Sequence, residues 1–174
     1  MQYFCIKFIL NMKKYFYFLS FLLLLISCTE DVRFNNPAFQ TLKDNNFWRA
    51  QVYEAGTESN GTFVIHGSLG YEQISFKLPT PTVKTYVLGV DDVTKAIYKN
   101  TYNGQEAEFS TGTAKGSGQI VVTEYNTEEK TISGTFKFTV VNTDPSAEKQ
   151  EMHFSEGVFY KIPVASQGNF VLVD

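Results

Sequence analysis

The chain has 174 residues, of which 43% are hydrophobic and 16% aromatic, and its formal net charge at pH 7 is −3. This balance is typical of one globular domain with a packed core. It argues against a nucleic-acid-binding protein, which needs an excess of Lys and Arg to meet phosphates.

The first predicted element is an export signal. Lys13 and Lys14 precede an apolar and aromatic run over residues 15–26, as in the charged and hydrophobic regions of a signal peptide. The run is shorter than the roughly 20 residues that a membrane-spanning helix needs, so a plain transmembrane helix or a buried core segment is the weaker alternative. Met12 begins a signal of ordinary proportions, and a start at Met1 or at Met12 gives the same mature protein.

The apolar run ends in Leu25-Ile26-Ser27-Cys28, which resembles the lipobox of bacterial lipoproteins. A branched residue stands three positions before the cysteine, a small residue directly precedes it, and the cysteine takes the diacylglycerol. We therefore predict that residues 1–27 are a signal peptide and that Cys28 is the lipidated N-terminus, with the membrane as a partner. Because two acyl chains hold a protein stably, a cysteine with a diacylglyceryl group and an N-acyl chain such as palmitate would stay anchored.

Residues 28–45 are predicted to be a tether, with one turn of helix where Phe39 and Leu42 stand three apart. Thr29-Glu30-Asp31 resembles the export signal that moves some lipoproteins to the outer face of the outer membrane, and a solvated tether is the other interpretation. The predicted location is the cell envelope, as an outer membrane lipoprotein on the periplasmic or the surface-exposed face.

Removal of residues 1–27 takes away three lysines and no acidic residue, so the formal charge falls from −3 to −6, with 12 basic against 18 acidic residues. This charge argues against nucleic acid and against adhesion to anionic lipid. Cys5 leaves with the signal and Cys28 is acylated, so the mature domain has no disulfide and depends on its core. Residues 46–174 are long enough to bury such a core as a single domain.

The mature sequence predicts an all-β fold, an antiparallel β-sandwich or flattened β-barrel of roughly ten strands. In the clearest strand, residues 131–141, apolar Phe136, Phe138 and Val140 alternate with polar residues. Glu156-Gly157 interrupts a similar alternation and predicts a bulge or a strand break. The other predicted strands are 48–53, 61–67, 73–78, 84–90, 93–98, 106–110, 118–125, 151–162 and 169–173.

Strand and turn sequences rich in glycine and aromatic residues follow one another in the C-terminal half. They are GSGQIVVT at 116–123, KTISGTFKF at 130–138, EGVF at 156–159 and IPV at 162–164, preceded by FWRA at 47–50 and KTYVLG at 84–89. Together they resemble a family of small bacterial lipoproteins with a domain of unknown function, the DUF6252-like group. The resemblance covers most of residues 46–164, implies a β-sandwich or flattened barrel on a lipid tether, and transfers no functional residues.

The histidines and acidic clusters predict no metal or cofactor. His66 and His153 alternate with apolar neighbours and are predicted to be ordinary surface residues, because no ligand spacing such as His-x-His supports zinc. Asp91-Asp92 and the sequence at 142–144 would suit calcium, but their spacing fits no known loop, and Asx turns explain them more simply.

Motifs for covalent or nucleotide chemistry are absent from the sequence, and residues 112–116 are too short for a phosphate loop. We therefore predict no enzyme. The alternative is a glycan-active hydrolase whose carboxylates converge from separate loops, and the candidates are Asp91-Asp92, Glu106 with Glu108, and Glu128-Glu129. Solvated loop or edge charges are the simpler interpretation.

Six tyrosines of the mature chain stand at strand ends or near turns, where they could form a ligand surface. They are Tyr53, Tyr71, Tyr98, Tyr102, Tyr125 and Tyr160. The alternative is that they only cover strand ends, as amphipathic rings do in many β-proteins. The sequence therefore predicts a membrane-anchored, non-enzymatic β-domain with a binding or structural role, whose ligand is a glycan, a small apolar molecule or an envelope protein.

The anchor predicts the behaviour of Cys28→Ala. This variant lacks the sulfur that takes the lipid, so we expect a protein that is not lipidated and stays unprocessed or soluble. Cleavage of the signal and partitioning into detergent measure the effect. Cleavage and partitioning equal to those of the wild type would rule out the anchor.

Overall fold

The computed structural model describes residues 36–165, and every regular element in this range is a β-strand. No helix in this range is long and apolar enough to cross a membrane. The eleven strands, which confirm the all-β prediction, are β1 (Ala38–Lys43), β2 (Asn46–Arg49), β3 (Val52–Thr57), β4 (Phe63–Leu69), β5 (Glu72–Leu78), β6 (Thr85–Leu88), β7 (Lys95–Asn100), β8 (Ala107–Ser110), β9 (Ser117–Asn126), β10 (Thr131–Asn142) and β11 (Glu151–Pro163).

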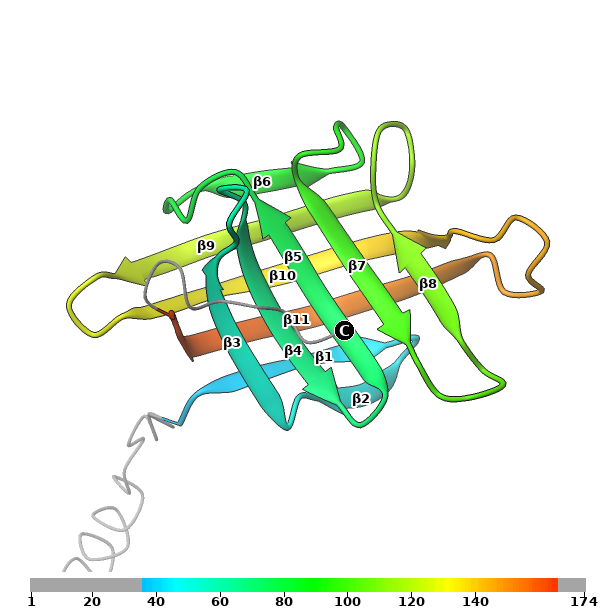
Figure 1. The fold of residues 1–174 in the computed structure, drawn as a ribbon, viewed down its shortest axis with the longest axis horizontal. Helices are drawn as coiled ribbons and strands as arrows, with labels where there is room; N and C mark the ends of the chain where they lie inside the picture. The colour runs from blue at the N-terminus through cyan, green and yellow to red at the C-terminus, as the bar shows by residue number, and fades with distance from the viewer. Residues whose placement is uncertain (1–35, 166–174) are drawn as a thin grey trace, which may run out of the picture. The chain divides into compact units, whose positions relative to one another are not determined.

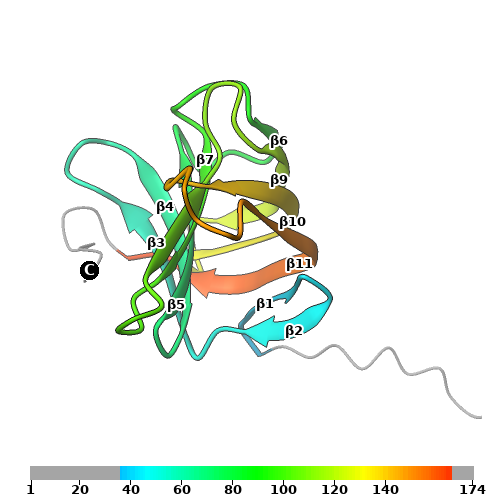
Figure 2. The ribbon, with the colours of Figure 1, turned by 90° about the vertical axis from the view of Figure 1, so that its right-hand side faces the viewer.

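The strands form two layers that face each other (Figures 1 and 2). One layer has the order β8-β7-β5-β4-β3 and the other the order β6-β9-β10-β11-β1-β2, with antiparallel pairing throughout. In Figure 1 the strands of the first layer cross those of the second at a steep angle, as in orthogonally packed sheets. The prediction of an antiparallel β-sandwich or flattened β-barrel is therefore confirmed.

Two junctions join the layers into one curled sheet. At the first, β10 pairs with β9 as far as Thr139 and then with β8 at Val141 and Asn142. At the second, Val164 forms a parallel bridge with Ala55 of β3 just after β11 ends. The sheet thus curls around its own core as a half-barrel.

Phenylalanine rings from both layers fill that core. The ring of Phe76 in β5 is fully buried, and its centroid lies 4.8 Å from that of Phe136 and 5.6 Å from that of Phe39. The ring centroids of Phe138 and Phe159 lie 5.7 and 6.2 Å from that of Phe76. Since burial of one such side chain contributes about 1.5–3 kcal/mol, this cluster is a principal contact between the layers.

The interruption predicted at Glu156-Gly157 is a β-bulge. Glu156 has a φ of 53°, and the register of β11 against β10 shifts between Phe136 and Phe138. A Cβ at Gly157 would overlap the ring of Phe136. The bulge and the missing side chain together leave room for that ring in the core.

Residues 37–45 form no helical turn, and this part of the predicted tether belongs to the domain. Ala38–Lys43 is strand β1, paired with β11 on one edge and with β2 on the other. Phe39 and Thr41 are buried, and their two-residue spacing is the period of a strand. The prediction relied on the three-residue spacing of Phe39 and Leu42, and Leu42 is only half-buried.

The other predicted strands within the described residues overlap observed strands, but one alternation fails. Trp48 and Ala50 are buried as expected, whereas Val52 is 60% exposed. The chain leaves β2 and enters β3 around Gln51, so the inward and outward positions are reset between Ala50 and Val52. The strand predicted for residues 169–173 lies outside the described residues.

Close packing at Gly134 predicts a steric effect on stability. A Cβ there would overlap the carbonyl oxygen of Val121 and the ring of Phe159. We expect Gly134→Ala to lower the free energy of unfolding by about 1–3 kcal/mol, because the strand or the ring must move. Urea unfolding followed by the fluorescence of Trp48 measures the change. Thr135→Ala, at the exposed next position, is the control and should cost less than about 0.5 kcal/mol; equal costs would contradict the steric explanation.

Candidate functional site

Three connections meet at one end of the domain: the β4–β5 turn, the β7–β8 loop and the β10–β11 loop. The backbone N–H of Thr101 donates to the carbonyl oxygen of Tyr71 at 3.0 Å, which joins the first two. The backbone N–H of Thr143 donates to the carbonyl oxygen of Glu108 at 2.8 Å, which joins β8 to the third. Distant parts of the chain therefore build one continuous surface.

Two exposed tyrosines project from this end. Tyr71 and Tyr102 are 58% and 48% exposed, and their ring centroids lie 5.2 Å apart in an edge-to-face arrangement. The backbone N–H of Tyr102 donates to Asn100 Oδ1 at 3.0 Å, and its carbonyl oxygen accepts the N–H of Gln105 at 2.8 Å. A fixed loop that presents exposed rings loses little conformational entropy when a ligand binds.

The six predicted tyrosines do not share one surface. Tyr98 is buried, and its ring centroid lies 5.7 Å from that of Phe154. Three others are half-buried on their own strands or beside a turn: Tyr53, Tyr125 and Tyr160. Tyr71 and Tyr102 are the two exposed members, so the candidate ligand surface reduces to this pair, which we call the tyrosine pair.

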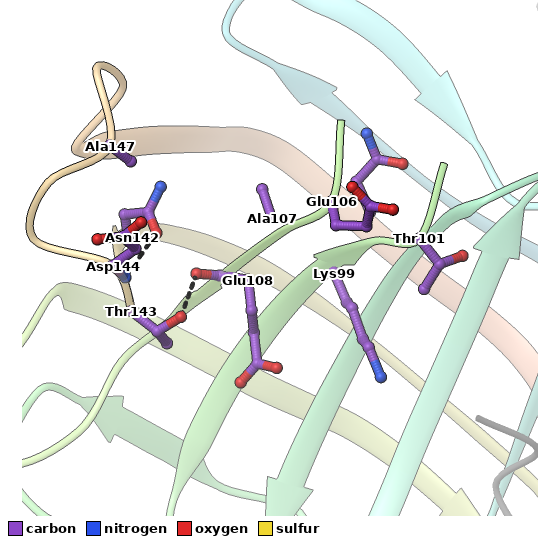
Figure 3. A pocket seen from close by; sticks show the side chains of 10 residues that line it. Lys99, Thr101, Glu106, Ala107, Glu108, Asn142, Thr143, Asp144 and Ala147 are labelled. Carbon is purple, nitrogen blue, oxygen red and sulfur yellow. Dashed lines mark hydrogen bonds between the residues drawn. The ribbon is translucent and has the colours of Figure 1, made fainter. Parts of the chain in front are cut away.

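A groove of about 390 Å³ lies next to the tyrosine pair, between the β7–β8 loop and the β10–β11 loop (Figure 3). Thr101, which precedes Tyr102, lines it, and the hydroxyl of Thr143 donates to the Glu108 carbonyl oxygen at 3.0 Å from the other side. The charged residues of its wall are Lys99, Glu106, Glu108 and Asp144. The groove is open, and its wall combines charged and polar groups with a larger apolar surface, which suits a ligand with both hydrogen-bonding groups and apolar faces.

Acidic groups outnumber basic ones in this groove. Lys99 and Glu108 stand opposite each other on β7 and β8, so their charges offset. Glu106 and Asp144 remain, and two hydrogen bonds from Ser146 hold the pKa of Asp144 below its usual value. The groove is therefore anionic at neutral pH and favours neutral or cationic ligand groups.

A partly buried carboxylate next to the tyrosine pair joins strands of both layers. Glu72 of β5 follows Tyr71 in the chain and accepts hydrogen bonds from Trp48 Nε1 and from the Tyr98 hydroxyl, each at 2.7 Å. Lys43 forms an ion pair with the same carboxylate. Since these donors belong to β2, β7 and β1, the cluster ties the first layer to the second.

The hydrogen bonds outweigh burial at Glu72. Burial alone raises the pKa of the carboxyl group, but the donors from Lys43, Tyr98 and Trp48 lower this pKa below its usual value. Burial and then the neighbouring carboxylate raise the pKa of the Tyr98 hydroxyl. A charged carboxylate with three donors stabilises the fold and is poorly suited to proton transfer.

The adjacent carboxylates proposed from the sequence serve turns. Asp91 Oδ1 accepts two backbone N–H groups of its own turn at 2.9 and 2.8 Å, which confirms the Asx turn. Asp92 forms an ion pair with Lys95 at 2.7 Å. Glu128-Glu129 lies in the exposed β9–β10 turn. None of these carboxylates lines the groove between the β7–β8 and β10–β11 loops.

The two histidines lie in different settings. The prediction of a surface position is wrong for His66, because β4 is flanked by β3 and β5 and is buried on both faces. Its Nδ1 lies 3.0 Å from Ser75 Oγ, and burial lowers its pKa. His153 is exposed as predicted, with Nδ1 3.0 Å from Thr139 Oγ1. Across residues 36–165, no three His, Cys, Asp or Glu side chains are grouped so as to hold a metal ion.

The predictions for the N-terminal segment lie outside the described residues. They concern the signal peptide at 1–27, the lipidated Cys28 and the acidic Thr29-Glu30-Asp31. These stay predictions.

The comparison with protein families agrees with the extent of the fold. Residues 35–163 match the family model of a domain of unknown function, DUF6252, a range that includes every strand from β1 to β11. The chain belongs to the DUF6252 family. The resemblance to the DUF6252 family is thereby confirmed, and the match begins at residue 35, just before β1, whereas the resemblance was drawn from about residue 46 onward. No curated protein and no solved structure matches the chain.

Sequence reasoning missed the Glu72 cluster and the groove. The alternation of Ile74, Phe76 and Leu78, extended back by two residues, places Glu72 on the core face, so that signal was present. The groove has no comparable local signal, because it depends on the pairing of β8 with the end of β10.

The Glu72 cluster predicts a pH-dependent contribution to stability. We expect Glu72→Gln to lower the free energy of unfolding by about 1–2 kcal/mol at pH 7, a value reduced for a side chain that is 25% exposed. The pKa of Glu72 is lower in the folded chain than in the unfolded chain. Its contribution is therefore present above the unfolded pKa of about 4.3 and is lost as the pH falls through the folded value.

The difference between wild type and Glu72→Gln should therefore shrink below about pH 4.3. Urea unfolding at a series of pH values measures it. Glu124→Gln, at an exposed position of β9, is the control and should show little difference at any pH. A pH-independent difference at Glu72 would contradict the role of its charge.

Proposed function

We propose that this protein is a lipid-anchored, non-enzymatic glycan-binding protein of the bacterial cell envelope. The exposed tyrosine pair beside the anionic groove carries this proposal. The membrane is one partner, through the lipid on Cys28, and a polysaccharide of neutral or amino sugars is the other. The protein then resides at the outer membrane, on the periplasmic or the surface-exposed face.

The position of the tyrosine pair relative to the tether supports a role in capture. Strand β1 begins at Ala38, ten residues after Cys28, and ten residues reach at most about 33–36 Å. The strand ends at Lys43, which pairs with Glu72 next to Tyr71. The tyrosine pair therefore lies at the end of β1 that is remote from the tether, about 20 Å further along the strand direction.

The chemistry of the surface suits sugars. Tyrosine rings offer apolar faces to the C–H groups of a sugar ring, and their hydroxyls can hydrogen-bond to the sugar hydroxyls. The groove wall adds the carboxylates of Glu106 and Asp144 as acceptors and the ammonium of Lys99 as a donor. A small apolar ligand would require an enclosed apolar cavity, and this groove is open and carries charged groups.

The directions of the pKa shifts argue against four carboxyl groups as the general acid of a glycosidase. A glycosidase keeps one carboxyl group protonated by raising its pKa and places a second carboxylate about 5–10 Å away. Hydrogen-bond donors lower the pKa of every described carboxyl group that has a shifted pKa, namely Asp44, Glu72, Asp92 and Asp144. At Asp44 and Glu72 this lowering outweighs the rise in pKa that burial causes. None of the four suits the role of general acid.

The tyrosine pair predicts a loss of glycan affinity on truncation. We expect Tyr71→Ala and Tyr102→Ala each to weaken binding by about 5- to 10-fold, or about 1–1.4 kcal/mol, because each removes a ring that packs against the sugar. Titration calorimetry of the full chain measures the effect with three probes: purified envelope polysaccharide, neutral gluco-oligosaccharides and amino-sugar oligosaccharides.

Phe47→Ala provides the matched control, because Phe47 is an exposed aromatic residue of β2 that belongs neither to the tyrosine pair nor to the wall of the groove. This control should bind like the wild type. A loss equal to that of Tyr71→Ala, or no binding to any of the three probes, would contradict the proposal. Release of reducing ends that Glu106→Gln or Glu108→Gln abolishes would establish the hydrolase instead.

A further inference from the structure

Exposed valines surround an open edge of the second layer. β6 pairs with β9 and with no other strand of the described chain, so one of its edges is free. Four valines in or near this strand are 57–64% exposed: Val83, Val87, Val90 and Val93. They are half of the large hydrophobic side chains that are exposed in residues 36–165. The exposed apolar surface is therefore concentrated at this edge, which we call the valine edge.

The register shows which backbone groups the valine edge presents. The carbonyl oxygen of Lys84 accepts the N–H of Val122 at 3.0 Å, so Lys84 is a hydrogen-bonded position facing β9. The pairing continues in register as far as Leu88. In an antiparallel pair such positions alternate with positions whose groups face away. The N–H and C=O groups of Thr85 and Val87 therefore point toward the free edge, and both residues are exposed.

We propose that the valine edge is a homodimer interface, in which the free edges of two copies pair antiparallel about a two-fold axis at Tyr86. Thr85 of one copy then stands opposite Val87 of the other, and vice versa. Each of these two pairs exchanges two main-chain hydrogen bonds, which gives about four in all. The Val87 side chains of both copies lie on the outer face of the joined sheet, where each shields the other from water.

The charge of this region favours a second copy as the occupant. Residues 83–95 contain two lysines and two aspartates and therefore carry no net charge, and Asp92 is paired with Lys95. The mature chain as a whole carries −6, so two copies repel each other over most of their surface. A neutral apolar edge lets them approach at the least electrostatic cost. A basic partner would instead be drawn to the acidic surfaces elsewhere.

The size of the edge sets the strength of the contact. A four-residue strand buries much less than the roughly 800 Å² per partner of a standard stable complex. The dimer is therefore weak and depends on concentration. Attachment of both copies to one membrane, as proposed above, would raise their effective concentration, although the dimer does not require the proposed function.

Sedimentation equilibrium of the full chain in mild detergent, over a concentration series, tests the proposal. We expect a reversible dimer that Val87→Asp weakens at least about tenfold, because the two new carboxylates would lie diagonally across the axis from each other. Val52→Asp makes the same change at a valine that is 60% exposed on β3, and it should leave the dimer unchanged. A wild-type chain that stays monomeric throughout, or an equal effect of the two substitutions, would overturn the proposal.

A second variant distinguishes loss of the dimer through lost main-chain pairing from loss of the dimer through unfolding. Val87→Pro removes an N–H that does not bond to β9, so the thermal unfolding midpoint should stay near that of the wild type. We expect this variant to lose the dimer while it remains folded. A folded Val87→Pro that dimerises like the wild type would overturn edge pairing.

Discussion

The pairing of β8 with the last residues of β10 determines both the fold and the candidate site. Val141 and Asn142 continue β10 beyond the reach of β9 and pair there with Ser110 and Phe109. This contact carries the sheet from one layer to the other, so that the two layers close over Phe76. It also places the β7–β8 and β10–β11 loops on opposite sides of one groove. Without it, the acidic groups of these loops would belong to separate surfaces.

Local patterns in the sequence predicted the class of fold and most of its strands, because alternation in a strand is a relation between neighbours. The bulge at Glu156-Gly157 could be predicted for the same reason. Strand β1 could not be predicted in this way, since its two large apolar residues, Phe39 and Leu42, fit a helical spacing and only Phe39 is buried. The partners that make it a strand are β11, far along the chain, and β2.

The candidate site was only partly predictable. A tyrosine near a turn can be recognised in the sequence, but its exposure depends on which strands meet around it. Tyr98 faces Glu72 and the core, whereas Tyr71 and Tyr102 are brought together by two turns that are separate in the chain. At Glu72 the inward position could be predicted, because it follows from the alternation along β5. Its three hydrogen-bond donors could not be predicted, because they come from other strands.

The course of β1 has a mechanical consequence. The chain enters β1 at Ala38, runs between β11 and β2, and reverses at Asp44-Asn45 beside the loop end of the domain. A pulling force between the N-terminal segment and Tyr71 acts along the strand direction. The hydrogen bonds of β1 to both neighbours then share the force in shear, and they must break together. A domain stretched in this direction therefore resists extension better than one whose first strand could be peeled away bond by bond.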